Sequence, residues 1–120
     1  MKKENKPLVS VIINCHNGEK FLKGCISSII NQTYSNLELI FWDNQSCDQS
    51  AQIVKRFRHP KIRYFLAPTH TCLGEARFLA LSKAKGNWIA FLDCDDYWDN
   101  DKLKFQVNAI KAHKGNVGFV

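Results

Sequence analysis

Long hydrophobic runs are missing from this sequence. Its longest apolar stretches, such as Trp88 to Leu92, span only a few residues, whereas a helix that crosses a bilayer needs roughly 20. The basic residues near the N-terminus are not followed by an apolar block with a small-residue cleavage site, so the pattern of a secretory signal peptide is absent too. We therefore expect no membrane span and a cytoplasmic location.

Cysteine pairs are also missing. The five cysteines form no CxxC pair, and their number is odd, which argues against a complete disulfide framework. The spacing of cysteines and histidines also disfavours zinc. We interpret the cysteines as reduced thiols, with Cys25 on the apolar face of a predicted helix.

Two common phosphate-binding motifs do not occur. The sequence has no GxGxxG after its first predicted strand and no GxxxxGK[ST]. It therefore lacks the glycine-rich loops with which dinucleotide-binding and P-loop proteins hold phosphate groups. It also has no linker, internal repeat or low-complexity stretch. With 45% hydrophobic residues, residues 1–120 are expected to form a single domain with a hydrophobic core.

The charge is unevenly distributed along the chain. The formal net charge is +6, yet five of the 11 acidic residues lie between Asp93 and Asp101. A basic domain with one acidic spot indicates anionic ligands together with a cation site. Lysines that only solvate exposed helix faces would give the same total, so charge alone leaves nucleotide, nucleic acid and membrane surface open as partners.

Short apolar runs alternate with stretches long enough to hold a helix. This alternation favours an α/β fold, with a Rossmann-like, mainly parallel sheet and helices on both of its faces. Apolar periodicity places helices at about 21–30, 48–57, 74–84 and 103–110. The predicted strands are Val9–Ile13, Leu37–Trp42, Ile62–Leu66, Trp88–Leu92 and Val117–Val120.

Several boundary residues refine this prediction. Phe21 is expected on the buried face of the first helix, and Asp48 is expected to cap the second. Gly86 is expected as a left-handed stop after the third helix, and Gly115 closes the fourth. Because the last apolar strand ends the sequence without covering structure, we expect a truncated piece of a longer domain.

Polar residues follow three of the predicted strands directly. These segments are Asn14-Cys15-His16-Asn17-Gly18, Asp43-Asn44-Gln45-Ser46 and Asp93-Cys94-Asp95-Asp96. Ligands of open α/β sheets bind beyond the carboxyl ends of the strands. Each segment by itself is also typical of a turn, but three at one sheet edge indicate a binding site.

The strongest of these motifs is the acidic one. Three carboxylates within four residues repel one another unless a cation compensates. A hard divalent ion does this with oxygen ligands, and it can also bridge the protein to two phosphates. The alternative is a solvated acidic turn in which Asp99 or Asp101 caps the next helix. The position after an apolar strand favours the metal site.

Other polar residues near this edge have two interpretations each. Asp43 could accept hydrogen bonds from a base edge or a ribose hydroxyl, or it could form a turn. Arg77 could contact phosphate from the start of a helix, or it could pair on the surface with Glu75 or an aspartate. His16 and His70 lie in loops without the neighbours of a nucleophile–base pair, so neither is assigned a catalytic role.

The order of these motifs resembles family-2 glycosyltransferases of the GT-A fold from about Pro7 to the C-terminus. The opening strand and loop, a helix end, the second strand and the acidic motif all occur in the family's order. His16 departs from a common tyrosine, Asn14 from a proline or small residue, and Phe78 from an asparagine. The similar segments are 9–17, 27–34, 37–43, 74–77, 84–96 and 102–103.

The resemblance implies inverting transfer of a sugar from a nucleoside diphosphate donor, with UDP expected, to a hydroxyl of a glycan or lipid-linked acceptor. It implies a role in polysaccharide or glycoconjugate biosynthesis. Manganese or magnesium would be held by the DxD carboxylates Asp93 and Asp95, with Asp95 as the direct ligand. The general base is expected beyond residue 120. The nucleotide-sugar-binding residues would be Asn14, His16, Asn17, Asp43, Arg77, Asp93, Cys94 and Asp95.

Two hypotheses from other classes compete with this one. The first is a catalytically inactive nucleotide-binding or interaction domain of the same fold. The second is a basic nucleic-acid binder, which is disfavoured because no recognised basic–aromatic module is present. We therefore expect no nucleic-acid partner, and we expect the full-length enzyme to associate peripherally with the inner face of the membrane. The sequence leaves the oligomeric state open.

Overall fold

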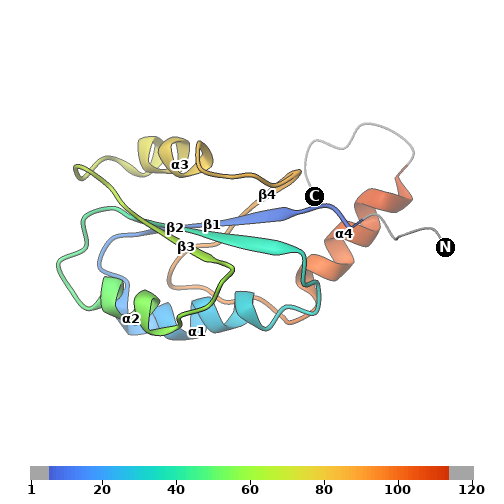
Figure 1. Ribbon diagram of the computed structural model, residues 1–120, viewed down its shortest axis with the longest axis horizontal. Coiled ribbons are helices and arrows are strands. Elements are labelled where there is room, and N and C mark those ends of the chain that lie inside the picture. The colour runs from blue at the N-terminus through green and yellow to red at the C-terminus, as the bar shows by residue number, and fades with distance from the viewer. Residues whose placement is uncertain (1–5, 114–120) are drawn as a thin grey trace.

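The computed structural model describes residues 6–113 (Figure 1). Four strands and four helices alternate along this part of the chain, as predicted. The fifth predicted strand, Val117–Val120, and Gly115 lie outside the described residues. The elements are β1 (Val9–Cys15), α1 (Glu19–Ile30), β2 (Leu37–Asp43), α2 (Ser50–Arg56), β3 (Ile62–Leu66), α3 (Leu73–Leu81), β4 (Trp88–Phe91) and α4 (Lys102–Ala112).

The strands form one parallel sheet in the order β3-β2-β1-β4. The chain moves outward from β1 to β3 and then returns to the other side of β1 as β4. The strand order therefore reverses between β1 and β4, and such a switch point opens a crevice at the carboxyl ends of the strands. In Figure 1, α3 covers one face of the sheet, and α1 and α2 cover the other. The predicted α/β architecture is confirmed.

Alternating side chains of the strands build a core on each face of the sheet. Val11 and Ile13 of β1 belong to the larger core, which also holds buried residues of α1, α2 and α4. Ile12 lies on the opposite face and packs with Ala76 and Ala80 of α3. The small alanine side chains let α3 approach the sheet closely. Because helices cover both faces, strand residues of both parities are buried, and β2 is buried along its whole length.

Two boundary predictions were wrong. Phe21 is 53% exposed, because Leu22 and Ile26 already occupy the sheet-facing side of α1. Gly86 is not a left-handed stop, since no glycine between residues 6 and 113 has a positive φ, and α3 ends at Leu81. A glycine is instead required at position 86 because there is no room for a side chain: a Cβ there would lie 2.7 Å from the Ser10 backbone nitrogen.

The N-termini of α1 and α2 are joined by two carboxylates. Asp48 was predicted to cap α2, but the residue at the N-cap is Gln49. From the position before it, the Asp48 side chain accepts a hydrogen bond from the first amide of α2, at Ser50 (2.9 Å), and another from the amide of Glu19 (3.1 Å). Glu19 in return accepts from the amide of Gln49 (2.9 Å). Each acidic side chain thus satisfies an otherwise unpaired amide of the other helix. This contact fixes the loops beside the carboxyl ends of β1 and β2.

Within residues 6–113, no helix combines the length and the apolar character that crossing a membrane requires.

Candidate functional site

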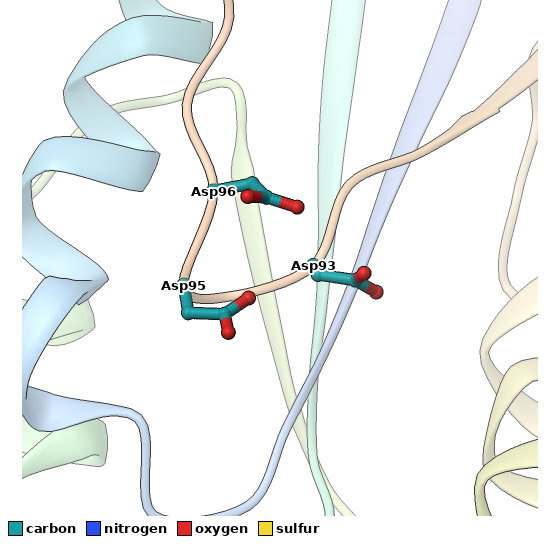
Figure 2. Close-up of side chains that lie close together, drawn as sticks. All are labelled: Asp93, Asp95 and Asp96. Carbon is teal, nitrogen blue, oxygen red and sulfur yellow. The ribbon is translucent and has the colours of Figure 1, made fainter.

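Three carboxylates gather in the loop that follows β4. Ligand oxygens of Asp93, Asp95 and Asp96 all lie within 4.8 Å of one another, and the three side chains are exposed. Figure 2 shows the Asp95 and Asp96 side chains pointing across the loop toward Asp93. Like charges this close raise one another's energy unless a cation offsets them. Carboxylate oxygens are the ligands that Mg²⁺ and Mn²⁺ prefer, so the donor set fits such an ion.

Helix α1 and the turn that follows it anchor this acidic loop at two points. The Cys25 thiol donates to the Asp93 carbonyl oxygen (3.5 Å). Beyond the end of α1, the amide group of Gln32 donates to the Asp99 carbonyl (2.6 Å) and accepts from the backbone amide of Leu103 (3.0 Å) in the first turn of α4. Gln32 is buried, so these bonds are shielded from water. The loop is therefore held between α1 and α4.

A guanidinium group lies beside the acidic cluster. Arg77 Nη2 of α3 is 3.7 Å from Asp93 Oδ1, and the two side chains are 44% and 66% exposed. An ion pair this exposed contributes little to stability. The pairing with an aspartate that we weighed for Arg77 is thus present. Its guanidinium group also adds a positive charge beside the three carboxylates.

An exposed pair of imidazole rings marks the loop after β1. The ring centroids of His16 and His70 are 4.5 Å apart, with the rings tilted by 59°. His16 Nδ1 donates to the Asn44 carbonyl (2.8 Å), because a carbonyl oxygen can only accept. Asn17, with a positive φ of 56°, accepts from the Cys47 amide (2.7 Å) and so joins the loops after β1 and β2.

Two buried polar atoms near this edge have no hydrogen-bond partner among the described residues. They are Asn14 Oδ1 on β1 and Trp42 Nε1 on β2, and these two residues are direct neighbours across the strands. One is an acceptor and the other a donor. Leaving such groups unpaired costs about 1–3 kcal/mol each, so a ligand or a water that reached them would be stabilised there.

The structure places Asp43 away from Asn14. Asp43 is 1% exposed, and its strand parity puts it on the α1 and α2 side of the sheet, next to Cys15. Oδ1 accepts from the Ser46 amide (2.9 Å), and Oδ2 accepts from the Tyr64 hydroxyl (2.5 Å). Burial, and then this bond to Asp43, raises the pKa of Tyr64. Asp43 therefore fixes the turn after β2, and its contact with a base stays a prediction.

The structure adds details of the edge that the sequence did not define. Cys94 turns its sulfur inward against Gly18 rather than joining the carboxylates. Asp96 belongs to the acidic cluster although we assigned metal binding only to its two neighbours; the run of three acids was the available signal. Asn44 was missed as well. Its side chain donates to the Thr71 carbonyl (2.8 Å) and accepts from the Thr71 amide (3.0 Å), a contact between distant loops that sequence alone does not show.

Comparison with known proteins identifies the family. The profile described as Glycosyl transferase family 2 matches residues 10–120, and the chain therefore belongs to this family. An uncharacterized glycosyltransferase of Haemophilus influenzae is 41% identical over 106 residues, covering 87% of this chain and 42% of the relative. The Escherichia coli UDP-Glc:alpha-D-GlcNAc-diphosphoundecaprenol beta-1,3-glucosyltransferase WfaP is 36% identical over 109 residues, covering 89% of this chain and 43% of that protein.

A solved structure shares the GT-A fold. Staphylococcus aureus TarS 1-349, in complex with UDP-GlcNAc, superposes with a TM-score of 0.84 at 30% identity. The match covers 88% of this chain and 31% of that structure. The chain thus spans less than half the length of the relatives it matches.

Proposed function

We propose that this chain is the nucleotide-sugar-binding part of a glycosyltransferase that takes a nucleoside diphosphate sugar as donor. The observation that carries the proposal is the cluster of Asp93, Asp95 and Asp96 at the carboxyl end of β4, beside the switch point of the sheet. Carboxylates alone would repel a diphosphate. With a divalent cation between them, the same carboxylates attract one, which explains why three acids lie together in an otherwise basic domain.

Each residue of the acidic edge has a role in this proposal. Asp95 and Asp93 hold manganese or magnesium, and Asp96 is positioned to share that task. When bound, the cation neutralises the negative charge that builds on the departing diphosphate. Arg77 supports the same charge from α3, since a guanidinium pairs well with phosphate oxygens. None of these steps requires a proton to move.

The nucleoside is proposed to lie over the loops that follow β1 and β2. The exposed His16 ring offers a surface on which a base can stack, and Asn14 Oδ1 and Asn17 offer polar contacts beside it. Asp43 contributes by holding the turn after β2 in place. UDP is the proposed nucleotide, and it is supported by TarS, whose structure contains UDP-GlcNAc.

For the whole enzyme we propose inverting transfer to a lipid-linked or glycan hydroxyl, with the general base beyond residue 120. The name of WfaP specifies a diphosphoundecaprenol-linked acceptor, and this supports an acceptor of that class here. An acceptor held in the bilayer would bring the enzyme to the inner face of the membrane from the cytoplasm.

Calorimetric titration of the purified chain with UDP tests this proposal. We expect binding in the presence of Mn²⁺ and a large loss of affinity after addition of a chelator. Circular dichroism of the same sample shows whether the chain is folded. No binding to a folded sample at millimolar UDP would favour the inactive interaction domain, and binding that ignores the chelator would exclude the metal role.

A further inference from the structure

Two cysteine sulfurs meet behind the acidic loop. Cys15 ends β1, and Cys94 lies between Asp93 and Asp95. A Cβ placed on Gly18 would lie 2.9 Å from the Cys15 sulfur and 2.8 Å from the Cys94 sulfur. Both sulfurs therefore lie beside Gly18, and the distance between them cannot exceed the sum of these two distances. Any residue larger than glycine at position 18 would push into both.

The polar surroundings of Cys15 favour its ionised form. The Ser50 and Ser46 hydroxyl oxygens lie 3.6 Å and 3.9 Å from its sulfur. The neighbouring Cys94 thiol has the largest influence on the pKa of the Cys15 thiol. Although burial opposes it, Cys94 and the polar groups of Ser50, Gly18 and Ser46 lower the pKa of Cys15 to about 7. A thiolate is the reactive form of cysteine.

The nearby Cys25 provides an internal contrast. The Cys25 thiol is buried and donates a hydrogen bond to the Asp93 carbonyl oxygen. Cys25 is therefore engaged with a partner other than Cys15 or Cys94. Cys15 itself is buried, but Cys94 is only half-buried, so small oxidants can reach the pair from the loop side.

We propose that Cys15 and Cys94 form a reversible oxidation site whose substrate is a peroxide. One sulfur attacks the O–O bond of hydrogen peroxide and becomes a sulfenic acid, while the other peroxide oxygen leaves as hydroxide and is protonated to water. The second sulfur then attacks the sulfenic sulfur, the disulfide forms, and the sulfenic oxygen leaves as water. Two thiols and one peroxide thus give one disulfide and two waters.

Disulfide formation would change the acidic loop. A covalent bond between the sulfurs draws Cys94 toward β1, because a disulfide brings its sulfurs to about 2.05 Å. Asp93 and Asp95 flank Cys94 in the chain, so their carboxylates move with it. This consequence rests on the proposed function: the oxidised chain should hold Mn²⁺ less tightly than the reduced chain.

Peptide mapping tests the oxidation site without any nucleotide or metal. Cys47 and Cys72 are exposed, so a variant with Cys47→Ser and Cys72→Ser is used to remove competing thiols. After treatment with one equivalent of hydrogen peroxide we expect an intramolecular loss of about 2 Da, a peptide linking residues 15 and 94, and full reversal by a phosphine reductant. Irreversible sulfinic acid alone, or a link through Cys25, would overturn the proposal.

Single substitutions in the same background sharpen the test. Cys25→Ser should keep the cross-link, whereas Cys94→Ser should abolish it; a cross-link that survives Cys94→Ser would overturn the assignment. Calorimetry with Mn²⁺ then compares the oxidised and reduced forms. We expect about ten-fold weaker binding after oxidation, equivalent to about 1.4 kcal/mol, with recovery on reduction. Equal affinities in the presence of the mapped disulfide would refute the effect on the loop but leave the proposed function intact.

Discussion

A buried glutamate links three parts of the sheet. Glu38 of β2 accepts hydrogen bonds from the Ser10 hydroxyl of β1 (2.6 Å), the Lys85 amide before β4 (2.7 Å) and the Arg63 guanidinium of β3 (2.8 Å). Burial opposes ionisation of Glu38. The three bonds together outweigh burial and hold the pKa of the carboxyl below its usual range. The charge of Glu38 is thus stabilised by folding.

Replacing this charge should destabilise the protein in a pH-dependent way. Because the folded-state pKa of Glu38 is lowered, its stabilisation is complete above the unfolded-state value of about 4.3 and is lost as the pH falls through the folded-state value. We expect Glu38→Gln to lower the free energy of unfolding by about 1–3 kcal/mol at pH 7 and by much less near pH 3. Urea unfolding at a series of pH values measures this difference.

The matched control is Glu75→Gln, which removes the same charge from an exposed position of α3. Its effect should stay within about 0.5 kcal/mol at both pH values. A Glu38→Gln penalty that does not change with pH would contradict the role assigned to the ionised carboxylate.

Sequence reasoning pointed to the residues of this sheet edge but not to the faces and contacts of their side chains. Asp93 and Asp95 were predictable because three acids directly follow an apolar strand. The side of the sheet on which Asp43 lies could not be predicted, because both faces of β2 are buried and its apolar run does not reveal which face a residue occupies. The contact between Cys15 and Cys94 was also hidden, since it depends on the parallel packing of β1 beside β4.

At the level of elements, two glycines of the same chain should respond in opposite ways to alanine. A Cβ on Gly86 would meet the Ser10 backbone nitrogen at 2.7 Å and the Leu8 carbonyl oxygen at 2.8 Å, so β1 and the segment before β4 would have to separate. We expect Gly86→Ala to cost about 1–3 kcal/mol. Gly24 in α1 has no atom within 4 Å of the added Cβ, and Gly24→Ala should stabilise the protein by about 0.5–1 kcal/mol.

Chemical denaturation of the two variants beside the wild type checks this pair. A neutral or stabilising Gly86→Ala would show that β1 and the segment before β4 pack less closely than the structure indicates.

The order and type of the elements were predictable because apolar periodicity reports them directly. The end of α3 was not, because Gly86 looked like a helix stop while its actual constraint is the backbone of β1.

For the molecule as a whole, donor binding and sugar transfer should be separable. The chain spans 42% of one curated relative and 43% of another. Transfer requires a base and an acceptor held within hydrogen-bond reach of the reacting centre, and we expect the remaining part of the enzyme to supply them. The 120-residue chain alone should therefore bind UDP and Mn²⁺ without forming a glycosidic bond.

Incubation of the chain with a panel of UDP-sugars and simple sugar acceptors, followed by mass spectrometry, measures this. Slow release of free sugar and UDP would agree with the expectation, since departure of the diphosphate involves only the described edge. Robust formation of a glycosidic product would contradict it and would direct the search for the base to Asp96, Asp99 and Asp101.

The central claim is that the acidic cluster binds a sugar diphosphate through a divalent cation, and one pair of variants tests it most directly. Asp95→Asn removes a carboxylate from the cluster. Asp101→Asn removes a charge from the same acidic stretch, but it keeps the oxygen that accepts from the Thr33 hydroxyl (2.7 Å). Calorimetry with UDP and Mn²⁺ should show binding at least about ten-fold weaker for Asp95→Asn, equivalent to about 1.4 kcal/mol or more, and nearly unchanged for Asp101→Asn. Equal affinity in the wild type and Asp95→Asn, or an equal loss in both variants, would contradict the account.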